Sequence, residues 1–431
     1  MILPITVNVS FNGTSHPIVI EDSSTELFLY QCMSISEIEP HRQVFIGLKD
    51  PFALQYTPDL SNVGLFPNQN LVLCPSENDI VPVSLDLPIF PQTLLPFSQA
   101  CISNPLQFAS SQEQKAIIQQ CLGLMQQRSE YETPHLQSHV LKHIPILPLL
   151  QDSLTHGASP PFVDTSSPSF ESVVRSQLTI CHESECAEKL FKGVLDWFHS
   201  TFQFVKQLSC EVCQSQTESA GRAQPNFNEQ IGRAQIVELY KCTKCSHFTR
   251  FPRYNSVIAI LESKRGRCGE FVQAFACILR SLLFKVRIVN DFKDHLWVEI
   301  RSPFINNGHW THVDPCEKSV NKPLLYSKGW KKKYSMVLAF DSNSVVDVTT
   351  RYQKGSELIN ARRKKLLGPQ ANEWLSTLIV ILSKHKQINL SIDDVRWIED
   401  DVRKEIDELK SLVYEDEGDH QEYSGRISGT L

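Results

Sequence analysis

The 431-residue sequence lacks a long apolar run, and this absence bears on the location of the protein. No stretch approaches the roughly 20 apolar residues that a membrane-spanning helix needs. The start, Met1–Ser10, has no basic segment followed by a long apolar run, so we expect no signal peptide. The formal net charge is −6, which offers no general attraction for nucleic acid or an anionic membrane. We therefore expect a cytoplasmic protein, with the nucleus left open as a second location, no membrane insertion and no nucleic-acid partner.

The composition is that of a folded protein, with 41 % hydrophobic and 21 % charged residues. The length is typical of two or three domains. The cysteine count of 13 is odd, and four of these cysteines form two C-x-x-C pairs. This pattern favours a reducing compartment and a metal site over a secreted disulfide framework.

Residues 1–75 carry the pattern of a small α+β domain. Two strand patterns joined by an Asn-Gly turn are followed by a possible capping box, a helix and further strands. This order is typical of a β-grasp fold, and the segment resembles a ubiquitin-like domain. It does not end in Gly-Gly, so we expect a docking module and not a conjugated tag. The predicted elements are strands Ile5–Phe11 and Pro17–Ile20 around Asn12-Gly13, the capping box Ser23-x-x-Glu26, helix Leu27–Met33, and strands Gln43–Leu48 and Leu71–Leu73.

The rest of the chain predicts a linker, one large core and a tail. Residues 76–104 form the Pro- and Ser-bearing linker, residues 105–415 the core, and residues 416–431 a disordered acidic tail. Apolar residues near helical spacing predict a helix over Ala187–Phe204. The core contains a cysteine-rich segment at 205–250, a segment of one helix and several strands at 255–352, and C-terminal helices at 370–413.

The paired cysteines predict a zinc site. Cys210-x-x-Cys213 and Cys242-x-x-Cys245 are separated by 28 residues, and two such knuckles supply the four thiolates of a tetrahedral site. Four unrelated thiols, or a redox-active pair, are the alternatives. Because four protein ligands leave no open position, we expect one structural Zn²⁺ per chain and no catalytic role for it.

Cys268 is the candidate nucleophile. It lies in Gly266-Arg267-Cys268-Gly269-Glu270, directly before Phe271–Leu283, an apolar run of helical length. A helix N-terminus favours the thiolate form of a cysteine, and glycines permit a close approach of the backbone. A lone cysteine at a helix start is nevertheless usually inert.

Two later strands supply a candidate base and its partner. His295–Arg301 alternates in polarity, and His309–Asp314 places His312 and Asp314 on one side of a further strand. A thiolate, a histidine and a carboxylate form a plausible triad, in which His295 protonates the leaving group and Asp314 orients the imidazole. The residues alone leave His312 and Glu299 as competing candidates.

Six motifs occur in order over residues 250–352: "RFPRYN", "GRCGE", "DHLWVEI", "HVDPCE", "NKPLLYSKGW" and "VVDVTTRY". With the C-x-x-C pairs and "VELYKC" they closely resemble the cytoplasmic peptide:N-glycanases of the transglutaminase-like superfamily. The resemblance implies an α+β fold: a papain- and transglutaminase-like core with a structural zinc knuckle, preceded by the β-grasp ubiquitin-like domain. It assigns the nucleophile to Cys268, the histidine to His295 and the aspartate to Asp314.

The resemblance also implies an activity and substrate contacts. It implies an amidase that removes N-linked glycans from misfolded glycoproteins in the cytosol through a Cys thioester, converting Asn to Asp. The β-grasp pattern of residues 1–75 separately suggests docking to the proteasome or to machinery of ER-associated degradation. Glu317 and Trp330 fall on positions that touch the innermost sugar, although a surface carboxylate and a core indole are the alternatives. A transglutaminase, a cysteine peptidase and an inactive adaptor remain the rival functions.

Three residues depart from the family pattern. Phe271 and Phe204 stand where the family usually has Trp, and Lys293 where it commonly has Thr. The Trp that Phe204 replaces would be a candidate oxyanion donor. A phenyl ring can stack on a sugar but donates no hydrogen bond, so Phe204 is expected to contact substrate without that donor.

Overall fold

The structure is a computed structural model, and the ranges that it describes are 4–11, 14–21, 23–38, 40–46, 60, 65, 67–75, 101–153, 167 and 169–412. The Asn12-Gly13 turn, most of the linker at 76–104 and the tail at 416–431 therefore lie outside the described residues. In the part of the chain that is described, no helix is both long and apolar enough to cross a membrane.

The chain divides into two compact units, one with the bounds Met1–Phe108 and Val380–Ile406, the other Ala109–Ile379 and Asp407–Leu431. The domain boundaries expected from the sequence stay predictions.

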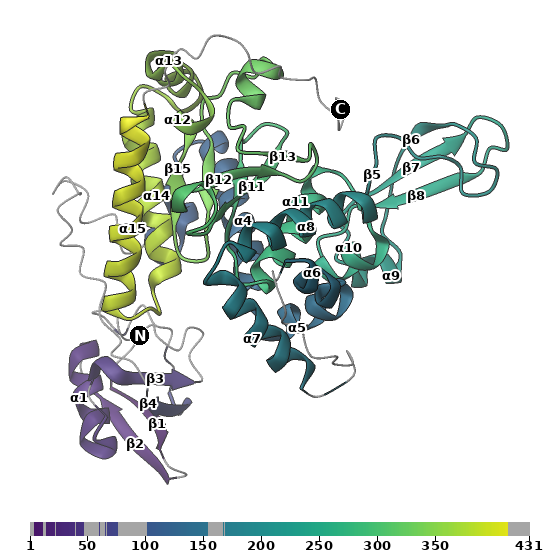
Figure 1. The fold of residues 1–431 in the computed structure, drawn as a ribbon. Coiled ribbons are helices and arrows are strands. Elements are labelled where there is room, and N and C mark those ends of the chain that lie inside the picture. Colours follow the sequence, from purple (N-terminus) through teal and green to yellow (C-terminus); the bar gives the residue numbers. More distant parts are fainter. Residues whose placement is uncertain are drawn as a thin grey trace. The chain divides into compact units, whose positions relative to one another are not determined.

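The N-terminal sheet has four strands in the order β2-β1-β4-β3 (Figure 1). Strands β1 (Ile5–Phe11) and β2 (Thr14–Ile20) form an antiparallel hairpin, β4 (Asn70–Pro75) pairs parallel with β1, and β3 (Gln43–Ile46) pairs antiparallel with β4. Alternate residues of β1 are buried beneath helix α1 (Thr25–Ser36), which is the burial expected for a sheet with one covered face.

The start of α1 corrects one prediction. The Ser24 hydroxyl, and not that of Ser23, caps the helix by accepting the backbone N–H of Leu27 at 3.3 Å. Both residue types serve as helix caps, so the sequence does not distinguish two neighbouring serines.

The second unit contains a six-stranded antiparallel sheet in the order β13-β12-β11-β10-β14-β15. Helix α11 (Cys268–Ser281) packs against β10 (Lys285–Asn290) and β11 (Leu296–Arg301) (Figure 1). Its residues from Phe271 to Leu279 are all buried, because other elements surround the helix. This burial explains why the sequence there is almost entirely apolar, with Gln273 as its one polar residue.

The predicted helix over Ala187–Phe204 ends earlier than expected. Helix α8 (Cys186–Thr201) stops three residues before Phe204, which lies on the short strand β5 (Gln203–Phe204). Strand β5 pairs in parallel with β9 (Arg265–Gly266), just before Cys268. Phe198 and Phe202 stack at 4.2 Å across this boundary, so aromatic packing continues after the helix has ended.

A separate three-stranded antiparallel sheet carries part of the cysteine-rich segment (Figure 1). Its strands are β6 (Thr217–Ala223), β7 (Val237–Cys242) and β8 (Phe248–Pro252).

The remaining elements complete the two units. They are α4 (Gln112–Glu130), α5 (Pro134–His143), α6 (Ile146–Ser153), α7 (Phe170–His182), α9 (Phe227–Ile231), α10 (Val257–Ser263), β12 (Thr311–Asp314), β13 (Ser319–Val320), β14 (Leu338–Phe340), β15 (Val345–Asp347), α12 (Thr349–Tyr352), α13 (Ser356–Leu367), α14 (Ala371–Gln387), α15 (Ile392–Ser411), the 3-10 turns η1 (Pro40–Arg42), η4 (Pro105–Phe108) and η5 (Asn306–Gly308), and the π-helical turn η6 (Leu325–Gly329).

Candidate active site and metal centre

Cys268 is the first residue of α11, as the sequence predicts. Gly266 permits the tight approach to the helix, since a Cβ at this position would lie 2.4 Å from the Cβ of Glu270. The Glu270 carboxylate accepts the backbone N–H of Arg267 at 3.0 Å, which satisfies a donor at the helix start. The thiol is half-buried, and its backbone N–H lies in the first turn, where the helix has partial positive charge.

Ion pairs connect this helix start to the three-stranded sheet. The Arg253 guanidinium donates to both carboxylate oxygens of Glu270, at 2.6 and 2.9 Å, and also to Glu238 on β7 at 3.1 Å. Arg267, the residue before the thiol, donates to Glu238 at 2.7 Å and to the Tyr240 hydroxyl at 2.6 Å. The three-stranded sheet, whose strand β7 ends at Cys242, therefore supports the backbone of the candidate nucleophile.

His295 and Asp314 meet as the triad prediction requires. The His295 Nε2 and Asp314 Oδ2 atoms are 2.7 Å apart, and both side chains are buried. His295 directly precedes β11, and Asp314 ends the neighbouring strand β12. Because Nε2 faces the carboxylate, Nδ1 is the ring nitrogen left for the hydrogen bond between His295 and the Cys268 side chain.

This arrangement favours a charged imidazole. Burial alone would lower the pKa of His295, but the charge of Asp314 and its hydrogen bond, followed by the interactions with Cys268, raise it to about 9. Burial opposes ionisation of Asp314 as well, yet the charge of His295 and its hydrogen bond hold the pKa of that carboxyl below its usual value. The geometry thus suits an imidazolium held between the Asp314 carboxylate and the Cys268 sulfur.

The loop before β11 is built around the buried Asp291 carboxylate. Its Oδ1 accepts three backbone N–H groups, those of Lys293, Asp294 and His295, at 2.9, 3.1 and 3.1 Å. The Asp294 carbonyl lies 3.9 Å from the Cys268 Sγ atom, so this loop borders the thiol directly. Asp291 therefore positions His295 at the end of the loop.

Lys332 connects this loop to a second one. Its Nζ atom lies 2.5 Å from Asp291 Oδ2 and also contacts the Asp294 carboxylate. The same ammonium lies 5.5 Å from the centre of the Trp330 ring. The loop that carries Trp330 is in this way attached to the loop that carries His295.

The two competing candidates lie in other environments. Burial lowers the pKa of His312 to about 4, and its ring bonds the Tyr326 hydroxyl and the Lys322 backbone. Glu299 forms an ion-paired cluster with Arg287 and Arg351 and accepts the Tyr352 hydroxyl. The geometry favours His295 as the base, because His295 is the histidine that interacts with the Cys268 side chain.

The candidate substrate residues surround the triad. The ring of the half-buried Trp330 lies edge-on to that of His295, with centroids 5.0 Å apart. Glu317 follows Asp314 closely, and its backbone N–H is 3.4 Å from Asp314 Oδ1. Phe204 is half-buried and packs on Phe271 at 5.3 Å, so two of the departures from the family pattern lie together near the helix start.

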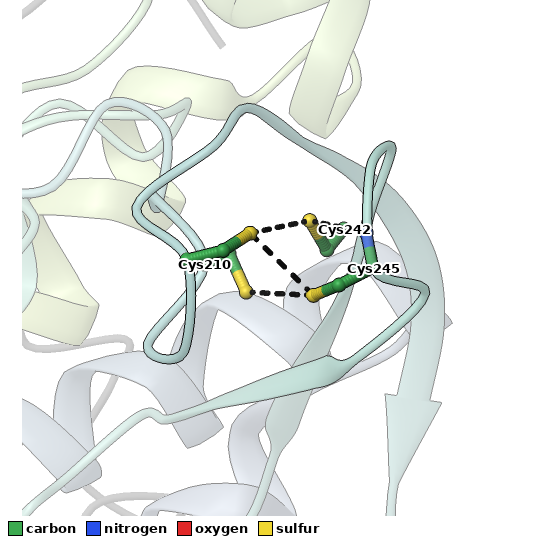
Figure 2. A group of neighbouring side chains, drawn as sticks. Cys210, Cys242 and Cys245 are labelled. Carbon is green, nitrogen blue, oxygen red and sulfur yellow. Dashed lines mark hydrogen bonds between the residues drawn. The ribbon is translucent and has the colours of Figure 1, made fainter.

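The four predicted metal ligands form one cluster. Cys210, Cys213, Cys242 and Cys245 place their sulfur atoms within 4.8 Å of one another. Neighbouring sulfurs are 3.4–3.5 Å apart, close to the spacing of about 3.8 Å that Zn–S bonds of ~2.3 Å give in a tetrahedron. Figure 2 shows the labelled Cys210, Cys242 and Cys245 converging from two turns of the chain.

The surroundings of the cluster fit a bound cation. The backbone N–H groups of Lys244 and Cys245 both donate to the Cys242 sulfur at 3.3 Å, and such donors stabilise a metal-bound thiolate. The donor set of four thiolates suits a soft or borderline metal ion. The cluster can therefore hold a structural metal.

Several residues of the site were not found from the sequence. The positions of Asp291, Tyr326 and Lys332 in the sequence give no sign, by the spacing of a helix face or a strand face, that these residues lie near the triad. The Lys332 contact joins residues 41 positions apart in the chain. Only the motif "NKPLLYSKGW", which contains Tyr326 and nearly reaches Lys332, marked this segment as unusual.

Comparisons with known proteins agree with the resemblance. Residues 217–315 match the family model described as the transglutaminase-like superfamily. Peptide-N(4)-(N-acetyl-beta-glucosaminyl)asparagine amidases are similar over much of the chain. The Arabidopsis thaliana enzyme is 34 % identical over 55 % of this chain and 32 % of its own length. The Homo sapiens enzyme is 33 % identical over 76 % of this chain and 47 % of its length. The Saccharomyces cerevisiae enzyme is 36 % identical over 49 % of this chain and 58 % of its length.

The matched region covers less than two thirds of each of these relatives. Among solved structures, a chain of a Rad4/XPC nucleotide excision repair complex is similar over 70 % of this chain and 60 % of that one. Its TM-score is 0.39 and its identity 14 %, so this similarity supports no conclusion about function. Residues 217–315 are thus similar to the transglutaminase-like superfamily, and about half or more of the chain is similar to curated peptide-N(4)-(N-acetyl-beta-glucosaminyl)asparagine amidases.

Proposed function

We propose that this protein is a peptide:N-glycanase, an amidase that releases N-linked glycans and converts the attached Asn to Asp. The observation that carries the proposal is the convergence of Cys268 at a helix start with the buried His295–Asp314 pair. The similarity to curated amidases of the same name supports the reaction class.

The first half of the reaction forms a thioester. The Cys268 thiolate attacks the side-chain carbonyl carbon of the glycosylated Asn, and the carbonyl oxygen takes up the electron pair. When the tetrahedral intermediate collapses, the C–N bond breaks and protonated His295 gives its proton to the departing glycosylamine. Asp314 keeps the imidazole oriented and stabilises its positive charge.

The second half releases the peptide. Neutral His295 takes a proton from water, whose oxygen attacks the thioester carbon. The C–S bond breaks and the thiolate returns. The peptide now has a carboxylic acid where it had a carboxamide, and this acid releases its proton to water to become a carboxylate. General acid–base catalysis of this kind requires one group to change its role between the two halves, and His295 is placed to do so.

The oxyanion must be stabilised by backbone donors in this proposal. The Cys268 backbone N–H at the helix start is the first candidate, because Phe204 donates no hydrogen bond. Trp330 and Glu317 are proposed to contact the innermost sugar: the indole lies beside His295, and an aromatic ring suits a sugar face.

The cysteine cluster is proposed to hold one Zn²⁺ ion. With four thiolates the ion has no open position and supplies structure, not chemistry. It would hold the turn before β6 to the turn that follows β7, and the Glu238–Arg253 and Glu238–Arg267 ion pairs would extend that support to the helix start.

Residues 1–75 are proposed to form a ubiquitin-like docking module. The strand order β2-β1-β4-β3 around α1 supports this. We propose misfolded N-glycoproteins as substrates, machinery of ER-associated degradation or the proteasome as the docking partner, and a cytoplasmic location with the nucleus as a second one. Deleting residues 1–75 should leave turnover of a small glycopeptide nearly unchanged; if turnover is lost, the segment is part of the catalytic unit.

One assay separates this function from its rivals. A denatured N-glycoprotein is incubated with the full-length protein and a labelled primary amine. A glycanase releases glycan and incorporates no amine, a transglutaminase incorporates the amine, and a peptidase cuts the chain. Absence of all three reactions would favour an adaptor and contradict the proposal.

A further inference from the structure

A chain of two buried side chains, Tyr326 and His312, is hydrogen-bonded to Asp314, and the Tyr326 ring also packs edge-on against His295 at 5.3 Å. The Tyr326 hydroxyl is 2.9 Å from Asp314 Oδ2, the same oxygen that His295 contacts. The His312 Nε2 atom is 2.7 Å from that hydroxyl. Tyr326 and His312 are both fully buried, so neither side chain exchanges these bonds with water.

The direction of every hydrogen bond in this chain follows from one backbone group. The Lys322 N–H donates to His312 Nδ1 at 3.3 Å, so Nδ1 carries no proton and neutral His312 bears its hydrogen on Nε2. That Nε2–H donates to the Tyr326 oxygen. The Tyr326 O–H is thereby directed at Asp314, which accepts it.

We propose that His312 and Tyr326 are positioning residues of the reaction, which hold the Asp314 carboxylate toward His295 through this one-way hydrogen-bond chain. The proposal rests on the proposed function. Tyr326 comes from the π-helical turn η6, and His312 lies two residues before Asp314 on β12. The Tyr326 ring also packs against the His295 ring at 5.3 Å, but its polar contact, like that of His312 through it, leads to Asp314.

The carboxylate has a complete set of donors. Oδ2 accepts from His295 and Tyr326, and Oδ1 accepts the backbone N–H of Cys316 at 2.8 Å and that of Glu317 at 3.4 Å. A carboxylate with donors on both oxygens cannot rotate without breaking several bonds. The plane of Asp314, and with it the direction of the imidazole, is thus fixed from behind.

The pair is suited to this role because it stays uncharged. Burial, opposed by the nearby Asp314 and Glu299 carboxylates, lowers the pKa of His312 to about 4, and burial raises the pKa of Tyr326 well above its usual value. The titratable groups around this arrangement come from several elements: Cys268 on α11 faces His295, Cys316 faces Asp314, Glu299 on β11 faces His312, and Tyr334 and Tyr352 face Tyr326.

Removing the Tyr326 hydroxyl should change the pKa of His295 in one direction only. The O–H donor draws negative charge from the Asp314 carboxylate, so its loss leaves that carboxylate a stronger partner for the imidazolium. His295 then holds its proton to higher pH. If the Tyr326 hydroxyl only filled space, its removal would lower the rate at every pH and leave the pKa of His295 unchanged.

The test compares Tyr326→Phe with the matched variant Tyr352→Phe. Tyr352 is equally buried, but its hydroxyl donates to Glu299 at 2.6 Å and not to Asp314. Alkylation of Cys268 by iodoacetamide is followed from pH 5 to 11, a readout that needs no glycan and that remains valid if the proposed function is wrong. Glycan release is then measured on the same variants.

We expect Tyr326→Phe to move the alkaline limb of the alkylation profile to higher pH. We also expect kcat to fall about tenfold with KM nearly unchanged, as for one lost hydrogen bond to a charged group. Tyr352→Phe should leave the limb in place. An alkaline limb that stays fixed or moves down in folded Tyr326→Phe overturns the proposal.

Two variants of His312 decide the matter if Tyr326→Phe does not fold. His312→Gln keeps an N–H donor for the Tyr326 oxygen, and His312→Leu does not. We expect the alkylation profile of His312→Gln to lie near that of wild type, and the alkaline limb of His312→Leu to shift to higher pH. Identical profiles for the two variants would contradict the chain of donors.

Discussion

Lys332 and Asp291 form an ion pair beside the candidate nucleophile, and replacing Lys332 with methionine tests what this pair does. Asp291 is fully buried, and the Lys332 side chain is only 10 % exposed. Removing one partner of a buried pair typically costs about 3–5 kcal/mol, because the other charge is left behind. Asp291 keeps its three backbone donors, so we expect the lower end, about 3 kcal/mol.

The assay is thermal unfolding together with glycan release. A loss of about 3 kcal/mol corresponds to about 6 °C in Tm for a unit of roughly 250 residues. We also expect kcat to fall at least about tenfold, because the loop that positions His295 loses its ion pair with the loop that carries Trp330. Lys333→Met is the matched control: Lys333 is exposed in the same lysine run, and its substitution should change stability by less than about 0.5 kcal/mol.

Asp291→Asn completes the design. The carboxamide oxygen can still accept the backbone N–H groups, but the charge is gone. If the ion pair is what matters, the double variant Asp291→Asn/Lys332→Met should be little worse than Lys332→Met alone. A Lys332→Met protein that melts and turns over like Lys333→Met would refute the reasoning.

The remaining predictions concern the metal, Phe204 and His295. A strong chelator should remove one metal ion per chain and abolish activity by loosening the three-stranded sheet; active protein with well under one metal ion by elemental analysis would contradict this. Phe204→Trp should raise kcat by less than about tenfold, and a gain of roughly a hundredfold, the size of one oxyanion donor, would mean that the missing indole limits catalysis. Because the pKa of His295 is raised from 6.5 to about 9, its stabilising contribution is complete below about pH 6.5 and is lost as pH rises through about 9. The difference in Tm between wild type and His295→Gln should therefore shrink between pH 7 and 10, and a constant difference would exclude the charged pair.

The sequence was informative where chemistry depends on local pattern. The glycines around Cys268 and the apolar run after it were sufficient to predict a thiol at a helix start. The alternation of the two later segments predicted the strands that adjoin His295 and end at Asp314. The strand pattern also put His312 and Asp314 on one face of their strand. In the sheet His312 pairs with Glu299, so that face continues onto the side of β11 that carries Glu299. Two C-x-x-C pairs predicted a cluster because their spacing brings thiolates together in pairs.

The sequence was less informative where contacts join distant segments. Nothing local indicates that Asp291 meets Lys332, or that the Tyr326 hydroxyl points at Asp314, because a π-helical turn has no recurrent pattern of apolar residues. The end of α8 at Thr201 was misplaced since Phe202 and Phe204 continue the apolar pattern after the helix has stopped. Local propensity could not decide between His295 and His312 either; three-dimensional placement was needed.

The most direct test of the account is the identity of the peptide product. A purified N-glycopeptide is incubated with wild type and with Cys268→Ala in ¹⁸O-labelled water, and the peptide is analysed by mass spectrometry. The account predicts that wild type yields a sugar-free peptide with Asp in place of Asn, carrying one ¹⁸O atom, and that Cys268→Ala yields none while keeping the melting temperature of wild type. Appreciable glycan release by Cys268→Ala, or a wild-type product that retains a sugar on Asn, would contradict it.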